Sequence, residues 1–197
     1  DGGVCVYCKA DEAERVTVPA EKEDTPTSKP KISREEAAQR ELALRALARK
    51  HMLPFIERFN PDYMAGGGHK DICQRLEKFS EDVVNKKSPR LMLFMPPRHG
   101  KSTLASMTFP AWHLGRNPSH EFISCSYSGS LAMTFSRKVR QLLREPNYRN
   151  IFAKTLLDRT SQSVESWLTT KGGGYVAAGV GGGITGKGAN ILVIDDP

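Results

Sequence analysis

The chain has 197 residues, of which 39% are hydrophobic and 26% are charged, a composition typical of a globular domain with a sizeable core. Its 29 basic and 22 acidic residues give a net charge of +7, which favours an anionic partner such as a nucleic acid or a nucleotide. No apolar run approaches the roughly 20 residues of a membrane span, so we expect no membrane partner.

The start of the chain lacks the pattern of a secretory signal peptide. Its four cysteines, at positions 5, 8, 73 and 125, are too irregularly spaced for a disulfide framework, which favours a reduced, cytoplasmic setting. Cys5 and Cys8 have the spacing of half a zinc knuckle. No second pair follows at a suitable distance, so we expect no zinc there.

We divide the chain into three parts. Residues 1–31 are predicted to be a flexible segment, because positions 10–31 are rich in Pro, Thr, Glu and Lys and poor in large apolar groups. Residues 32–86 are predicted to be helical. The first helix starts at a capping box of Ser33 and Glu36. A second amphipathic helix follows, with an apolar side formed by Ile72, Leu76, Phe79 and Val83.

Residues 87–197 change to the alternation of strands and helices that is typical of a parallel α/β sheet. Short apolar runs predict strands at 90–94, 121–127 and 191–196, and the first is predicted to be buried on both faces. Helices are expected between them, one bent or ended near Pro110 and one capped by Ser128 or Ser130.

The stretch PPRHGKST follows the first of these strands and ends in the second half of the phosphate-binding pattern G-x-x-x-x-G-K-[ST]. In such a loop, backbone N–H groups surround a phosphate at the start of a helix. Gly100 would let the backbone approach closely, Lys101 would bridge the β- and γ-phosphates, and the Ser102 hydroxyl would bind Mg²⁺. Met95 stands where the pattern has its first glycine.

A second motif, NILVIDDP, ends the chain with two carboxylates after an apolar strand. Asp195 is predicted to hold Mg²⁺, and Asp196 to orient or deprotonate the attacking water. Gly181, Gly183 and Gly186 fit a dinucleotide-binding pattern but precede a strand, so we reject that reading. We expect the glycine-rich residues 172–188 to form a mobile hairpin or loop beside the nucleotide site.

Several other residues keep two interpretations. Gln74 and His69 would either face an adenine or lie on a solvated helix. The basic residues of the helix after the second strand would either contact DNA phosphates or be solvated; these are Arg137, Lys138 and Arg140. Trp112 and Trp167 are predicted to be packing residues.

Taken together, several ordered blocks resemble the ATPase half of phage terminase large subunits, the motors that package viral DNA into an empty capsid. The blocks cover about residues 50–197 and are HKDICQRLEKF, LFMPPRHGKST, FPAWHLGRNPSHEFISCSYS, SRKVRQLL, YRNIFA and GGGITGKGANILVIDDP. The resemblance implies an α/β P-loop NTPase fold of the additional-strand type. Its mostly parallel sheet would be flanked by helices and truncated on its C-terminal side, so that the ATPase core is incomplete.

The resemblance also implies the roles of individual residues. ATP and Mg²⁺ would be held by the loop residues Pro97, Arg98, His99, Gly100, Lys101, Ser102 and Thr103, with Ser102 and Asp195 as metal ligands. The catalytic residues would be Lys101, Asp196 and Arg98, the last of which would sense the γ-phosphate. Many relatives have Glu in place of Asp196. Lys187 is the nearest equivalent of an arginine that reaches a neighbouring subunit's ATP, although it lacks the planar guanidinium.

The implied function is Mg-ATP hydrolysis that drives double-stranded DNA into a procapsid in the bacterial host cytoplasm. The implied partners are DNA, the portal protein, the small terminase subunit and further copies in a ring. The family's nuclease domain is absent from these residues, so we expect no DNA cleavage by them; whether they hydrolyse ATP alone stays open. The alternatives are a truncated prophage remnant that binds nucleotide or DNA without turnover, and an unrelated P-loop enzyme such as a helicase or small-molecule kinase.

Overall fold

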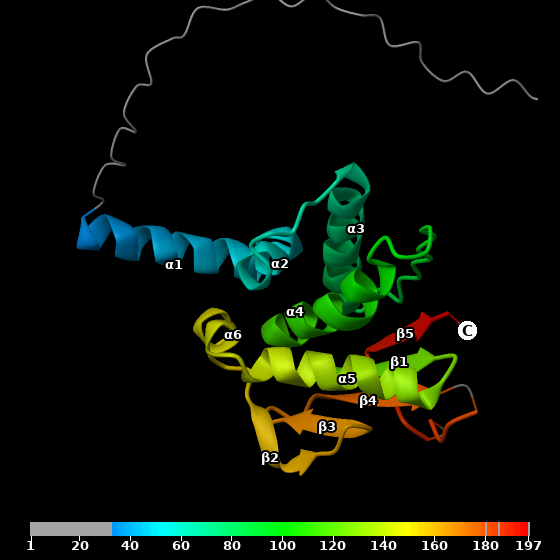
Figure 1. Cartoon of the computed structure of the whole chain (residues 1–197). Helices are drawn as coiled ribbons and strands as arrows, with labels where there is room; N and C mark the ends of the chain where they lie inside the picture. Colours follow the sequence, from blue (N-terminus) through cyan, green and yellow to red (C-terminus); the bar gives the residue numbers. More distant parts are fainter. Residues whose placement is uncertain (1–32, 180, 185, 197) are drawn as a thin grey trace, which may run out of the picture. The chain divides into compact units, whose positions relative to one another are not determined.

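The computed structural model describes residues 33–179, 181–184 and 186–196. The segment 1–31, with Cys5 and Cys8, lies outside these residues. Figure 1 shows the helices and the sheet that the strands form. The helices are α1 (Arg34–Lys50), α2 (Met52–Phe59), α3 (Gly67–Val84), the π-helical turn η1 (Thr103–Thr108), α4 (Phe109–Arg116), α5 (Gly129–Arg144) and α6 (Pro146–Ile151). The strands are β1 (Glu121–Ser126), β2 (Leu157–Gln162), β3 (Ser166–Thr169), β4 (Gly174–Gly179) and β5 (Ile191–Asp195).

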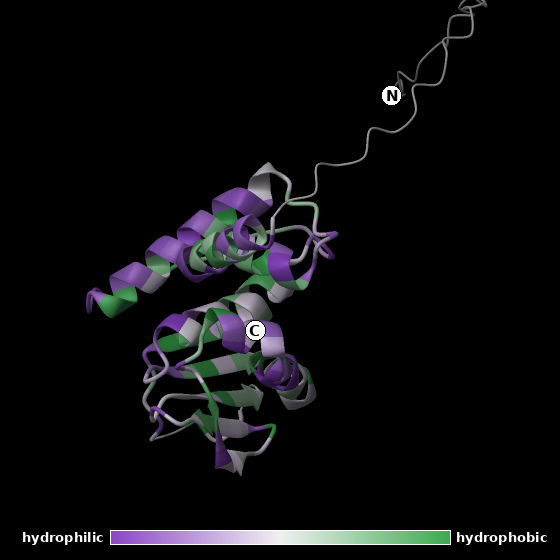
Figure 2. Cartoon of the chain, turned by 90° about the vertical axis from the view of Figure 1, so that its left-hand side faces the viewer, coloured by the Kyte–Doolittle hydropathy of each residue, from purple (hydrophilic) through white to green (hydrophobic). Residues whose placement is uncertain are grey.

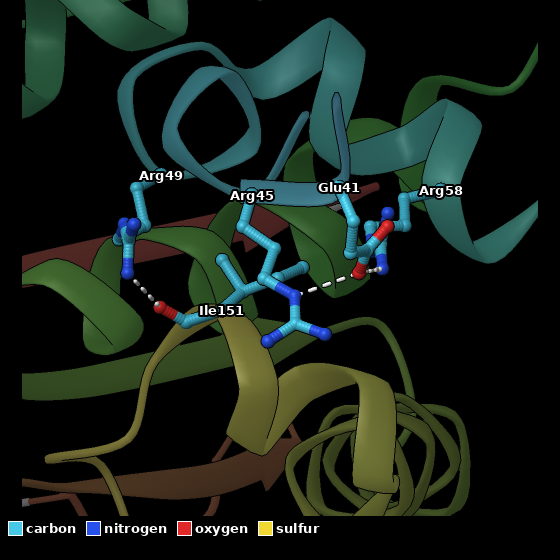
Figure 3. Close-up of polar contacts among 5 residues, drawn as sticks. All are labelled: Glu41, Arg45, Arg49, Arg58 and Ile151. Carbon is cyan, nitrogen blue, oxygen red and sulfur yellow. Dashed lines mark hydrogen bonds and ion pairs between the residues drawn. The ribbon is translucent and has the colours of Figure 1, made fainter. Parts of the chain in front are cut away.

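Helix α1 is built from strong helix formers and is tied to its neighbours by charged side chains (Figure 3). Glu41 accepts hydrogen bonds from Arg58 of α2 and from Arg45, whose Nε lies 2.7 Å from Glu41 Oε1. These bonds lower the pKa of the Glu41 carboxyl. Arg49 donates to the carbonyl oxygen of Ile151 over 3.3 Å, which satisfies one of the free carbonyls at the end of α6.

The sheet has five strands in the order β2-β3-β4-β1-β5. β1 is parallel to β4 on one side and to β5 on the other, whereas β2, β3 and β4 pair antiparallel. The expected strands at 121–127 and 191–196 are confirmed as β1 and β5, and the expected α/β class is confirmed. The sheet is mixed rather than mostly parallel. The interpretation of residues 172–188 as a hairpin or loop is wrong for residues 174–179, which form the strand β4 beside β1.

Close packing explains why β4 contains so many small residues. A Cβ on Gly179 would lie 2.5 Å from the backbone nitrogen of Gly129, at the start of α5. A Cβ on Gly174 would lie 2.5 Å from the carbonyl oxygen of Trp167 on β3. Real Cβ contacts are never this short, so glycine is required at both positions for the helix and the neighbouring strand to approach β4.

The predicted strand at 90–94 is wrong. Residues 91–95 belong to no strand of the sheet. Met92 and Phe94 are 78% and 86% exposed, while Leu91, Leu93 and Met95 pack partly against the core. One side of the run is therefore covered and the other faces solvent. An apolar run buried on both faces needs neighbouring strands, and among the described residues none pairs with this segment.

A single hydrophobic cluster joins α1–α4, α5, α6 and one face of the sheet. In Figure 2 apolar residues gather in the strands, and hydrophilic residues lie mainly on the helices. Trp112 and Trp167 are fully buried, as predicted for packing residues. The indole of Trp112 donates to the Ala48 carbonyl oxygen over 3.1 Å, and that of Trp167 donates to Ser136 Oγ over 3.0 Å. The buried polar tips are thus satisfied. None of the described helices is long and apolar enough to cross a membrane.

The helix after residue 100 continues through Pro110 because a π-helical turn precedes that proline. Pro110 has no N–H, and its ring would crowd the carbonyl four residues earlier in a regular α-helix. In η1 the amide of Phe109 bonds instead to the Leu104 carbonyl oxygen, five residues back. The Ser106 carbonyl, which Pro110 cannot satisfy, faces the Tyr175 hydroxyl at 3.5 Å. The helix is therefore altered at Pro110 but not ended.

A buried histidine connects α3, α4 and the chain before β1. His113 Nδ1 lies 2.7 Å from Ser80 Oγ, and its Nε2 lies 3.0 Å from His120 Nδ1. Burial, with smaller contributions from His120 and Arg116, lowers the pKa of His113 to about 3. Burial also lowers the pKa of His120. Both rings are thus held neutral under conditions in which an exposed histidine begins to ionise.

These lowered pKa values predict a pH-dependent stability. Below about pH 6.5 His113 and His120 bind protons in the unfolded chain but stay neutral in the folded chain. The free energy of unfolding therefore falls as the pH falls towards 3. A single such histidine contributes a slope of about 1.4 kcal/mol per pH unit. His113→Gln should therefore flatten the dependence of unfolding free energy on pH between about 6 and 4, as measured by urea denaturation. Gln141→Asn, at an exposed position of α5 with no ionisable group, should leave the slope unchanged, and equal slopes for all three proteins would contradict the assignment.

Candidate active site

The turn at residues 96–100 leads into the helix that starts at Lys101. Gly100 has φ +83°, a left-handed conformation that favours glycine, and Arg98 adopts φ +63°. His99 donates from Nδ1 to the Pro97 carbonyl oxygen over 2.8 Å, which closes the turn. The Gly100 carbonyl then accepts from Leu104 N over 2.9 Å and begins the helix. The backbone therefore folds tightly before the lysine.

Lys101 meets both carboxylates that follow β5. Its Nζ donates a hydrogen bond to Asp196 Oδ1 and lies 3.9 Å from Asp195 Oδ1. The bond to Asp196 raises the pKa of Lys101, with smaller Coulombic contributions from Asp196 and Asp195. Ser126 of β1 is in register with Asp195 of β5, so the cluster lies where these two parallel strands end at their carboxyl edge. Ligand sites of α/β folds commonly form at this edge.

The two aspartates have different surroundings. Asp195 is 5% exposed, and its Oδ2 accepts a hydrogen bond from Ser106 Oγ over 2.9 Å. Asp196 follows the strand with φ +48°, and its side chain is 67% exposed. Asp195 is thus a fixed, buried acceptor, whereas Asp196 is a surface carboxylate that contacts solvent and Lys101. One carboxylate is built into the fold, and the other is free to change partner.

The remaining loop residues lie at the same place with fewer contacts. Ser102 and Thr103 start the helix directly after Lys101, and Ser102 is half-buried. Arg98 is exposed and makes no ion pair with another described residue. The structure therefore brings Lys101 to Asp195 and Asp196, and Gly100 and Ser102 are its neighbours in the chain. The Ser102 hydroxyl itself has no hydrogen bond within the described part of the chain.

Two predicted residues lie outside this cluster. Lys187 lines a separate pocket of about 300 Å³ between β4 and the glycine-rich turn, together with Glu165 and Met133. It forms no ion pair with Asp195 or Asp196 in the described structure. Gln74 lines a second hollow of about 340 Å³ between α3 and residues 89–91. Neither residue contacts Lys101.

Two contacts of the site were not foreseen from the sequence. Ser106 lies four residues after Ser102, a spacing that places both on one side of a helix and so indicates a second hydroxyl near the carboxylates. His69 contacts the loop from α3, with its Nε2 3.0 Å from the His99 carbonyl oxygen. No sequence spacing relates residues that are 30 positions apart, so only the fold reveals this second contact.

Comparison with known proteins identifies the family of the chain. A family model described as "Terminase large subunit, T4likevirus-type, N-terminal" matches residues 92–197, which include the loop and both aspartates. No curated protein and no solved structure matches the chain. The matched residues make up more than half of the chain, so the chain belongs to the T4-like family of terminase large subunits, a family that acts in phage DNA packaging.

Proposed function

We propose that the chain is the ATPase part of a DNA-packaging motor, which uses Mg-ATP hydrolysis to drive double-stranded DNA into a procapsid. The observation that supports this most is the meeting of Lys101 with Asp195 and Asp196, across 94 residues of sequence, at the end of two parallel strands. A loop lysine next to paired carboxylates is the arrangement that phosphoryl transfer from a nucleotide requires.

The loop would bind the phosphates of ATP. The left-handed Gly100 opens the turn for close approach of a ligand, and the helix that begins at Lys101 presents its positive end there. Lys101 would bind the β- and γ-phosphates, and Arg98 would lie beside the γ-phosphate. The exposure of Arg98 agrees with a side chain that is available for a ligand.

The oxygen ligands of the site fit Mg²⁺, which prefers carboxylate and hydroxyl oxygens. Ser102 and Asp195 would hold the ion, and Ser106 keeps Asp195 oriented through its hydrogen bond. When bound, the ion would neutralise charge on the phosphate oxygens. Asp196 would orient the attacking water and accept its proton, a role that requires it to leave Lys101.

The packaging role implies macromolecular partners. Arg137 and Lys138 are exposed on α5 and would contribute to a DNA-binding surface. We propose that the chain works with the portal protein and the small terminase subunit as part of a ring in the host cytoplasm. In that ring Lys187, exposed on the glycine-rich turn, would approach a neighbouring subunit's ATP.

A second candidate is a chain that binds nucleotide without turnover, as a prophage remnant would. The position of residues 91–95 favours it, because a loop whose preceding segment pairs with no strand is less firmly held. Binding without hydrolysis, in the presence of Mg²⁺ and double-stranded DNA, would distinguish this candidate from the motor.

Lys101→Ala should lower ATP hydrolysis by the purified protein about 100-fold or more, because it removes a charge that stabilises the transferring phosphoryl group. Phosphate release with Mg²⁺ and double-stranded DNA measures the effect, and circular dichroism checks that the variant folds. Lys171→Ala, at an exposed lysine of the β3–β4 turn, should hydrolyse ATP at the normal rate. Hydrolysis that persists in Lys101→Ala would remove the assignment of the loop.

Asp196→Asn should separate binding from turnover. Loss of the carboxylate charge frees Lys101, so affinity for a non-hydrolysable ATP analogue should rise about two- to fivefold, as expected for an exposed ion pair. Turnover should fall about 100-fold, because the general base is lost. Isothermal titration and phosphate release measure the two quantities. Asp158→Asn, which changes the same charge on β2, should alter neither, and weaker analogue binding by Asp196→Asn would refute the proposed exchange of partners.

A further inference from the structure

One histidine of the helical region uses both ring nitrogens in hydrogen bonds, and one of these bonds reaches the loop before Lys101. His69 lies in the first turn of α3. Its Nδ1 lies 3.2 Å from the Gly66 backbone nitrogen, and its Nε2 lies 3.0 Å from the His99 carbonyl oxygen. The ring thus connects the start of α3 with the peptide just before Gly100. This residue lies outside the stretch matched by the terminase family model.

The two partners of His69 determine which nitrogen carries the proton. The Gly66 N–H can only donate, so Nδ1 must accept and carry no proton. The His99 carbonyl can only accept, so Nε2 must carry the proton and donate it. His69 is therefore a neutral imidazole with its proton on Nε2. Both nitrogens are used within the fold, which leaves neither one to recognise an adenine.

The contact with the His99 carbonyl also orients the next amide. In a trans peptide the C=O of residue 99 and the N–H of residue 100 point in opposite directions; the chain has no cis peptide among the described residues. Because the carbonyl is held towards α3, the Gly100 N–H points away from α3. Amides directed to one side of a turn form an anion-binding site.

The surroundings keep the ring in place. The Tyr63 ring packs against His69 with centroids 5.7 Å apart. A Cβ on Gly100 would lie 4.0 Å from His69 Nε2, which shows how closely the ring approaches the loop backbone. The His99 ring bonds the Pro97 carbonyl within the loop. The carbonyl of His99 is bonded instead by a side chain of α3, that of His69.

We propose that His69 is a positioning residue for nucleotide binding: it fixes the His99–Gly100 peptide so that its N–H faces the phosphates. The inference rests on the proposed function of the loop and adds a residue of the helical region to it. His69 touches no phosphate. It acts through the loop backbone, and its contribution is to the affinity for the polyphosphate part of a nucleotide.

The test uses three variants of the complete chain. Glutamine places an amide nitrogen near the position of Nε2, and asparagine places a polar atom near that of Nδ1. His69→Ala and His69→Asn should therefore weaken ATP binding about fivefold, the effect of one hydrogen bond, while His69→Gln should stay within about twofold of the wild type. Isothermal titration with ATP measures the affinities, and thermal unfolding checks that a change in affinity is not a loss of folded protein.

Tripolyphosphate is the decisive second probe, because it has phosphates and no base. If His69 orients the loop, His69→Ala should weaken tripolyphosphate binding by the same factor as ATP binding. An unchanged affinity for tripolyphosphate together with a weakened affinity for ATP would overturn the inference in favour of a contact with the base. His51→Asn is the matched control, because His51 bonds Glu77 through Nδ1 over 3.1 Å and does not contact the loop.

The outcomes separate this inference from the function on which it rests. The proposed nucleotide site is refuted if the wild type binds neither ATP nor tripolyphosphate. It is also refuted if the Lys101→Ala variant binds both as tightly as the wild type does. If Lys101→Ala abolishes binding while His69→Ala and His69→Asn bind like the wild type, the nucleotide site stands and the role of His69 is refuted. A failure of His69→Gln to restore binding would also refute it.

Discussion

The contacts at the carboxyl edge of this sheet depend on one buried carboxylate, that of Asp195. Asp195 is nearly fully buried at the end of β5, and a buried charge is costly unless hydrogen bonds and an opposite charge compensate it. Ser106 supplies the hydrogen bond and Lys101 the nearby positive charge. Both come from one helix, so the same contacts that compensate Asp195 bring the preceding loop to the end of β5. The loop and the carboxylates are thereby held together.

The helical region takes part in the site as well as in the core. Helix α3 shares the main hydrophobic cluster through Ile72 and Leu76, and its first turn bonds the loop through His69. The loop is therefore held from two sides: from α3 at the His99 carbonyl, and from β5 at Lys101. Helix α3 lies outside residues 92–197, the stretch that matches the family model. A helix outside the matched stretch therefore helps to hold a loop inside it.

The sequence predicted the parts of the fold that have strong local patterns. β1 and β5 are apolar runs of strand length, and Ser128 caps α5 by accepting from Leu131 N, as its position indicated. The meeting of Lys101 with the aspartates was predicted from the two motifs, although the strand expected before the loop does not form. The run at 90–94 has the same composition as a buried strand, but composition cannot say whether a partner lies beside it. β4 was not predicted because its glycines, which the close approach of α5 and of β3 requires, resemble those of a loop.

The π-helical turn before Pro110 has a consequence for the rotational phase of the helix. A π-helical turn contains one residue more than the matching α-helical turn. That extra residue rotates the part of the helix before η1 by about 100° relative to the part after it. The face of α4 that carries the buried Trp112 and Leu114 thus sets the direction in which Lys101 and Ser102 point. Removal of one residue between Thr103 and Thr108 would let the winding become regular and swing the lysine away from the aspartates. The contact between Lys101 and the aspartates depends on that local irregularity, so the number of residues between the loop and Pro110 matters as much as their identity.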